Sequence, residues 1–235
     1  MKDKRRRTAR QKAATVKRSN LTRARCHRVR NWRHSAEALV HHGYPVTVFI
    51  TVTWSALHRN KTLKKAHAPI LDLDIEAREK RLWDLIRRII KRHHTAFFGF
   101  RAPEFSGRFT EHLHIALHAS DVAIGDIINL LERETGSWAE RLGLEGKRVW
   151  RKDCKAHGVI ARSECGGYMV QRNLRPQTGG VERVVEYASK SAGKEKMGGQ
   201  HQLSYDLKRL TRQHMTAISS QHPPVEGQNF ATECG

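Results

Sequence analysis

The sequence lacks long apolar segments and is poor in acidic residues. No apolar run approaches the roughly 20 residues of a membrane-spanning helix, and the basic N-terminus has no apolar stretch like that of a signal peptide. We therefore expect a cytoplasmic, intracellular protein with no membrane partner. The chain has 23 acidic residues against 44 lysines and arginines, which gives a formal charge of +21. Because such a charge attracts polyphosphates, nucleic acid is the expected partner class.

Cysteine is also scarce, and its spacing argues against a disulfide framework. The four cysteines include no C-x-x-C pair, which is typical of reduced thiols in a cytosol. Cys154, His157 and Cys165 could bind zinc, but scattered reduced thiols are the favoured interpretation. With 235 residues, the chain is long enough to bury a core in one domain without disulfides or metals.

The basic residues are concentrated at the N-terminus. Between Lys2 and Arg33 there are 14 lysines and arginines but a single acidic residue. This composition predicts a flexible basic arm over residues 1–40, which either adds salt-sensitive affinity for phosphates or is only a solvated tail. We expect the main domain over residues 41–200, followed by a basic helix and a flexible tail over residues 201–235.

Hydrophobic periodicity predicts both strands and helices between the two ends. Runs rich in β-branched and aromatic residues predict strands at residues 46–53, 96–101, 109 or 111 to 119, and 159–163, the second and third forming a hairpin. Apolar residues at helical spacing predict helices at residues 72–93, 121–142, 181–192 and 203–218. The mixture of the two periods indicates an α+β domain.

Two histidines lie two residues apart in the third predicted strand. Since successive side chains of a strand point to opposite faces, His112 and His114 would share one face, while Leu113, Ile115 and Leu117 share the other. One face could then bind a metal together with a carboxylate, and the other could be buried. The same pair could equally line the solvent side of a half-buried strand.

A tyrosine and a lysine form the second candidate group. Tyr187 and Lys190 are three residues apart on a predicted helix, so they project from one side of it. A tyrosine is a poor nucleophile unless an adjacent cation or metal stabilises its phenolate, and Lys190 could supply that charge or contact a phosphate. Residues at this spacing also occur on amphipathic helices that have no catalytic role.

Three motifs, in this order, resemble those of the HUH endonucleases of rolling-circle replication proteins and related mobile elements. Phe49–Thr53 is similar to their threonine-rich strand, His112–Leu117 to their metal motif, and Tyr187–Lys190 to their nucleophile motif. The resemblance covers roughly residues 44–196. Some phage-type members have a second tyrosine where this chain has Ser191, so the resemblance is to the single-tyrosine type.

The resemblance implies a metal site beside a tyrosine nucleophile. His112 and His114 would bind Mg²⁺ or Mn²⁺, with Glu104 as the third ligand and Glu111 as the reserve candidate. The remaining motif would supply the catalytic residues Tyr187 and Lys190. Attack on DNA would leave a 5′-phosphotyrosine and a free 3′-hydroxyl.

The implied fold is a central antiparallel sheet of about five strands with helices packed on it. Because periodicity supplies four strands, the fifth is expected at residues 147–151 or 172–178. The implied function is that of an endonuclease that nicks single-stranded or hairpin DNA at a plasmid-type origin to start rolling-circle replication, with a host helicase and polymerase as further partners. The alternatives are a single-strand transposase, a hydrolytic metal-dependent nuclease and a non-catalytic nucleic-acid-binding protein.

Overall fold

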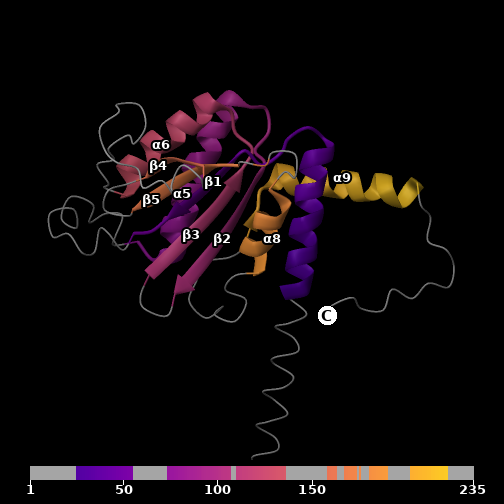
Figure 1. The fold of residues 1–235 in the computed structure, drawn as a ribbon, viewed down its shortest axis with the longest axis horizontal. Coiled ribbons are helices and arrows are strands. Elements are labelled where there is room, and N and C mark those ends of the chain that lie inside the picture. The colour runs from indigo at the N-terminus through magenta and orange to yellow at the C-terminus, as the bar shows by residue number, and fades with distance from the viewer. Residues whose placement is uncertain are drawn as a thin grey trace, which may run out of the picture.

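A computed structural model shows an α+β fold with one open antiparallel sheet (Figure 1). Within the described part of the chain, the sheet has six strands and is accompanied by five helices. The structure describes residues 25–54, 73–106, 110–135, 158–162, 167–173, 175, 180–189 and 202–221.

The strands place the sequence motifs at the centre of the sheet. Their order is β4-β5-β1-β3-β2-β6, and every neighbouring pair is antiparallel. The strand with the histidine pair therefore lies between the threonine-rich strand and the other strand of its hairpin. The strands are β1 (Val48–Val52), β2 (Gly99–Ser106), β3 (Thr110–Leu117), β4 (Val159–Arg162), β5 (Tyr168–Arg172) and β6 (Gln202–Leu203).

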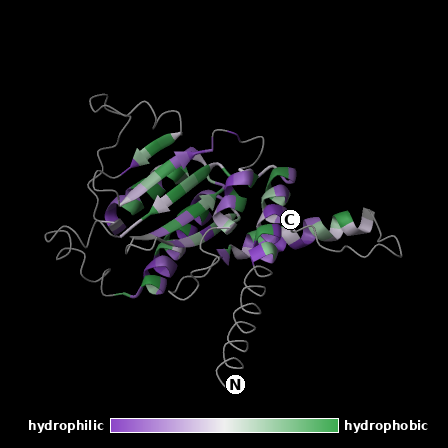
Figure 2. Ribbon diagram, turned by 60° about the horizontal axis from the view of Figure 1, so that its bottom comes forward, coloured by the Kyte–Doolittle hydropathy of each residue, from purple (hydrophilic) through white to green (hydrophobic). Residues whose placement is uncertain are grey.

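Helices cover both faces of the sheet. One face packs against α5 (Ile75–His93) and α6 (Asp121–Thr135), as the buried cluster on that side shows. The other face packs against the N-terminal helix (residues 25–41), α8 (Val181–Ser189) and the first part of α9 (Tyr205–Gln221). In Figure 2 these helices carry both hydrophobic and hydrophilic residues, as expected when only one side of a helix is buried.

Strand alternation divides the apolar residues between two cores. In β3, Leu113, Ile115 and Leu117 are buried on the α5/α6 side, whereas Ala116 is buried on the opposite side. Phe49 of β1 lies on the same side as Ala116. The prediction that Leu113, Ile115 and Leu117 share one buried face of this strand is therefore confirmed.

Local capping fixes where two of the helices begin and end. The Asp74 side chain accepts a hydrogen bond of 2.7 Å from the backbone N–H of Ala77, which caps the start of α5. The N-terminal helix ends at Gly43, whose φ of +78° is a conformation that only glycine adopts readily. The Tyr44 N–H then donates to the Leu39 carbonyl at 2.8 Å.

The prediction of a flexible arm over residues 1–40 is wrong for residues 25–40. Residues 25–41 form a helix, and Trp32, Ala36 and Leu39 on one side of it are buried against the sheet. Their spacing of four and three residues is that of one helix face. The apolar spacing was missed because many basic residues lie between these positions. Residues 1–24 lie outside the described part.

Residues 202–221, which follow the predicted main domain, pack on the same sheet. β6 pairs with β2, the Gly99 N–H donates to Ser204 Oγ at 3.1 Å, and Leu207 is fully buried. The helix predicted in this segment is confirmed as α9.

Periodicity did not find two of the six strands. β6 has only two residues, which is too short for an alternating pattern. β5 (Tyr168–Arg172) precedes the expected strand at residues 172–178 and shares only Arg172 with it. The proposed strand at residues 147–151 lies outside the described residues. Among the helices that are described, none is long and apolar enough to span a bilayer.

Candidate functional site

Two of the three candidate metal ligands on the hairpin, Glu104 and His114, are in direct contact. The register pairs Glu104 of β2 with His112 of β3, and Glu104 Oε2 lies 2.6 Å from His114 Nε2. The His114 side chain is 8% exposed and that of Glu104 34% exposed. The ring centroids of His112 and His114 lie 6.3 Å apart. The hairpin therefore gathers all three predicted ligands on one face.

The threonine-rich strand orients the His114 ring. Thr51 of β1 is the register partner of His114, and its Oγ1 lies 3.2 Å from His114 Nδ1. When one ring nitrogen is held by a hydroxyl, the other is free to face a ligand or a carboxylate. In this structure Nε2 faces Glu104.

The predicted nucleophile packs directly on His114. The Tyr187 ring stacks on the His114 ring with a centroid distance of 4.7 Å and an angle of 19° between the planes. The Phe49 ring meets Tyr187 edge to face at 5.8 Å. Tyr187 is 3% exposed. The fold thus brings the tyrosine of α8 against the histidine of β3 across a long sequence separation.

An arginine that the sequence analysis missed contacts the tyrosine hydroxyl. Arg183 Nε donates to Tyr187 Oη at 3.2 Å, and the guanidinium carbon lies 4.5 Å from the centre of the Phe49 ring. The same guanidinium also donates to the side-chain oxygen of Gln171 on β5. The signal in the sequence was the spacing of four residues between Arg183 and Tyr187, which places both on one side of a helix. Lys190, the partner that was predicted, lies outside the described residues.

The donor set fits a divalent transition metal. Two imidazoles and a carboxylate favour Mn²⁺ or a later metal over Mg²⁺. Ligands of one ion at about 2.1 Å lie about 3 Å apart, so the Glu104–His114 pair at 2.6 Å would open only slightly to admit a metal. Among the described residues, a group of donor atoms that all lie within 4.8 Å of one another occurs elsewhere in the fold, and Glu104, His112 and His114 are not part of it. His112 would therefore have to turn toward the pair.

Two weaker candidates remain: Glu111 as the reserve third ligand, and Tyr168 as a less favoured nucleophile, because no lysine follows it three residues later. Glu111 pairs with Phe105 in the register of the hairpin, next to the pair formed by Glu104 and His112. Tyr168 is buried in the α5/α6 core, where its hydroxyl donates to Glu132 at 3.3 Å. Tyr168 therefore cannot replace Tyr187 in this site.

The structure describes only some of the other residues whose role the sequence leaves open. Trp54 and Phe109 are aromatic residues that could stack on DNA bases or belong to the core. Trp54 is 2% exposed in the α5/α6 core, which makes it a core residue. Phe109 lies outside the described residues, and so do the residues of the possible zinc site, which are Cys154, His157 and Cys165.

The complete arrangement consists of a hydrogen-bonded histidine and carboxylate, a tyrosine stacked on the histidine, and an arginine on the tyrosine hydroxyl. It can bind a divalent cation, hold a phosphate and supply an oxygen nucleophile. A hydrogen bond from a guanidinium also stabilises negative charge that develops on a phenolic oxygen. No protein-family model, curated protein or solved structure matches this chain.

Proposed function

We propose that this protein is a replication-associated DNA endonuclease of the HUH type, which nicks single-stranded or hairpin DNA at an origin through a covalent tyrosine intermediate. The single observation that best supports this function is the stacking of Tyr187 on His114, which in turn contacts Glu104. A tyrosine that is far away in sequence thus meets the imidazole and the carboxylate of one hairpin on one face of the sheet. The formal charge of +21 supports DNA as the substrate.

The proposed reaction is a transesterification. The Tyr187 hydroxyl gives its proton to water, and its oxygen attacks the scissile phosphorus in line to form a 5′-phosphotyrosine. The bond from phosphorus to the 3′ oxygen breaks, and that oxygen takes up a proton to become a free 3′-hydroxyl. A divalent metal bound by Glu104, His112 and His114 would draw charge from a non-bridging phosphate oxygen.

Arg183 has a positioning and electrostatic role in this proposal. Its hydrogen bond to Tyr187 Oη stabilises charge on the oxygen as the proton leaves. Its contacts with Phe49 and Gln171 fix the direction from which it approaches the tyrosine. The free 3′-hydroxyl would serve as the primer for a host polymerase, and a host helicase would open the duplex ahead of it.

Substrate access requires a local movement at Tyr187. Because the residue is 3% exposed, a phosphate cannot reach its hydroxyl while the ring is stacked on His114. A rotation of the tyrosine side chain would free both the hydroxyl and the face of the histidine. DNA or metal binding is therefore expected to change the environment of Tyr187.

The test is a search for a covalent protein–DNA adduct on a denaturing gel. The protein is mixed with Mn²⁺ and a labelled pool of random-core single strands and hairpins. We expect an adduct with the natural chain, and none with Tyr187→Phe or with His112→Ala/His114→Ala. Tyr168→Phe is the matched control, because it removes a buried tyrosine hydroxyl from the opposite core and should leave the adduct unchanged.

Other outcomes would replace the proposal with one of its alternatives. Cleavage without attachment that persists in Tyr187→Phe would mean hydrolysis by activated water. An adduct that proceeds to joined strand ends, and that requires a dimer, would indicate a transposase. Metal-independent binding with no reaction across a well-sampled pool would indicate a non-catalytic nucleic-acid-binding protein.

A further inference from the structure

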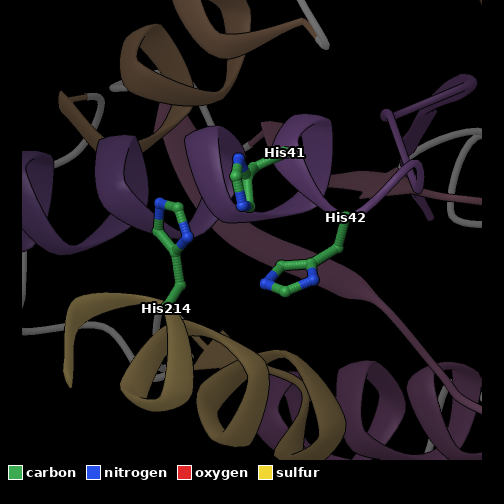
Figure 3. Close-up of side chains that lie close together, drawn as sticks. All are labelled: His41, His42 and His214. Carbon is green, nitrogen blue, oxygen red and sulfur yellow. The ribbon is translucent and has the colours of Figure 1, made fainter. Parts of the chain in front are cut away.

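Three histidines outside the candidate site gather where the N-terminal helix meets α9 (Figure 3). His41 and His42 lie at the end of the first helix, and His214 lies within α9. The ring centroids are 4.8 Å apart for His41 and His214, 5.1 Å for the adjacent pair, and 5.7 Å for His42 and His214. One nitrogen from each ring lies within 4.8 Å of the other two.

We propose that His41, His42 and His214 bind a Zn²⁺ ion, which joins the N-terminal helix to α9. Three imidazole nitrogens are an established donor set for zinc, and the fourth tetrahedral position can be taken by water. Nitrogens bound at about 2.0–2.1 Å in a tetrahedral site lie about 3.3 Å apart. His41 and His42 are exposed, so they can close this gap by rotation about their side-chain bonds.

The end of the N-terminal helix suits a cation. Gly43, with its φ of +78°, ends the helix directly after His42. The carbonyl end of a helix carries a partial negative charge, which favours a bound cation. Glu37 lies near enough to act electrostatically on His214, and its carboxylate contacts His34 at 3.4 Å. These groups offset part of the repulsion from the basic residues of α9.

The metal would hold α9 at the point where it leaves the fold. Leu207 is buried, and Thr211 Oγ1 lies 3.0 Å from Ser35 Oγ of the N-terminal helix. His214 follows one turn later, and most residues beyond it are exposed. Figure 1 shows the end of α9 projecting beyond the N-terminal helix. A zinc ion here would extend the docked part of α9 by one turn.

The test is a calorimetric titration of the full chain with Zn²⁺. The His112→Ala/His114→Ala chain serves as the background, so that zinc bound at the candidate active site does not contribute. We expect this chain to bind one equivalent of Zn²⁺. Adding His214→Ala, or His41→Ala with His42→Ala, should weaken binding at least tenfold. His27→Ala is the matched control, because His27 is an exposed histidine of the same helix that contacts Asn31 at 3.2 Å.

Thermal unfolding provides a second measurement that does not depend on enzyme activity. Zn²⁺ at a hundredfold excess over its Kd should raise the Tm of this background by about 5 °C or more, and it should not raise that of the His214→Ala variant. Equal Tm values without metal would show that His214→Ala leaves the fold intact. The proposal would be overturned if the background chain binds no Zn²⁺, or if it binds Zn²⁺ equally well without His214.

Discussion

Ile115 and His114 are neighbours in β3, yet they lie on opposite faces of the sheet and in different surroundings. Ile115 is fully buried among apolar side chains from α5 and α6. His114 contacts a hydroxyl, a carboxylate and the ring of Tyr187 on the side of α8. A shift of one residue along one strand thus separates a packing surface from a polar site. The comparison shows how a single strand can stabilise the fold and carry the chemistry at the same time.

The packing face is not purely apolar. Arg101 is 5% exposed and Glu79 is fully buried on the α5 side, and the Arg101 guanidinium lies 5.9 Å from the centre of the Trp83 ring. Burial lowers the pKa of Arg101, and the nearby carboxylate of Glu79 opposes that change. Charged groups are therefore present on both faces. The site face differs because polar groups from two neighbouring strands and a helix converge on one histidine.

The largest contrast should come from truncating the two neighbours in β3. Ile115→Ala leaves a cavity in the core and should lower the free energy of unfolding by about 2–5 kcal/mol. His114→Ala removes hydrogen bonds to Thr51 and Glu104, whose side chains are only partly buried, and should cost only about 1–2 kcal/mol. Urea denaturation monitored by circular dichroism measures both values. Equal losses would mean that the site face contributes as much to packing as the core does.

A comparison of two glycines should give effects of opposite sign. Gly180, before α8, has a φ of +70°, and an added Cβ would lie 2.7 Å from Phe49 Cζ. Gly180→Ala should therefore destabilise the protein by about 1–3 kcal/mol and reduce adduct formation, because Phe49 supports Tyr187. Gly125, in α6, has no atom within 4 Å of an added Cβ. Gly125→Ala should stabilise the protein by about 0.5–1 kcal/mol.

The same pair of variants also tests the separation of the two faces. Denaturation curves give the stability, and the covalent-adduct assay gives the activity. Gly125→Ala should leave adduct formation unchanged. If Gly125→Ala impaired adduct formation as much as Gly180→Ala, the two faces would not be independent.

The smallest expected effect is a pH dependence at the junction of α5 and α6. His94 Nε2 accepts a hydrogen bond from the Ser120 N–H at 3.0 Å, so the folded state requires this nitrogen to be unprotonated. Burial, then His118 and His93, lower the pKa of His94 from its usual 6.5. Above that value the group is neutral in both states. Below it the unfolded chain binds the proton more readily, so stability falls as the pH decreases.

The measurement is the urea midpoint at about pH 7.5 and about pH 5.5. His94→Gln retains an acceptor for the Ser120 N–H but cannot titrate, so it should lose less stability on acidification than the natural chain. His27→Gln, at an exposed position, should behave like the natural chain. Identical acid sensitivity in all three proteins would refute the role of His94.

Local patterns predicted a substantial part of this fold. The alternation in β3, its hairpin with the preceding strand, and the helix at the C-terminal end follow from periods of two and of 3.6 residues. The pairing of Glu104 with His112 does not, because β2 continues to Ser106, beyond the end predicted at residue 101. The stacking of Tyr187 on His114 agrees with the idea that both motifs serve one site. The chemistry at this site stays a prediction until the adduct is sought.

Only the tertiary structure decided the contacts between segments that are distant in sequence. The sequence by itself determined which residue types alternate along each strand and which lie on one side of each helix. It did not determine that Arg183 would meet the Tyr187 hydroxyl, that the N-terminal helix would cover the site face, or that His214 would approach the end of that helix. The physical reason is that periodicity depends on neighbours along the chain, whereas these contacts depend on how whole elements pack.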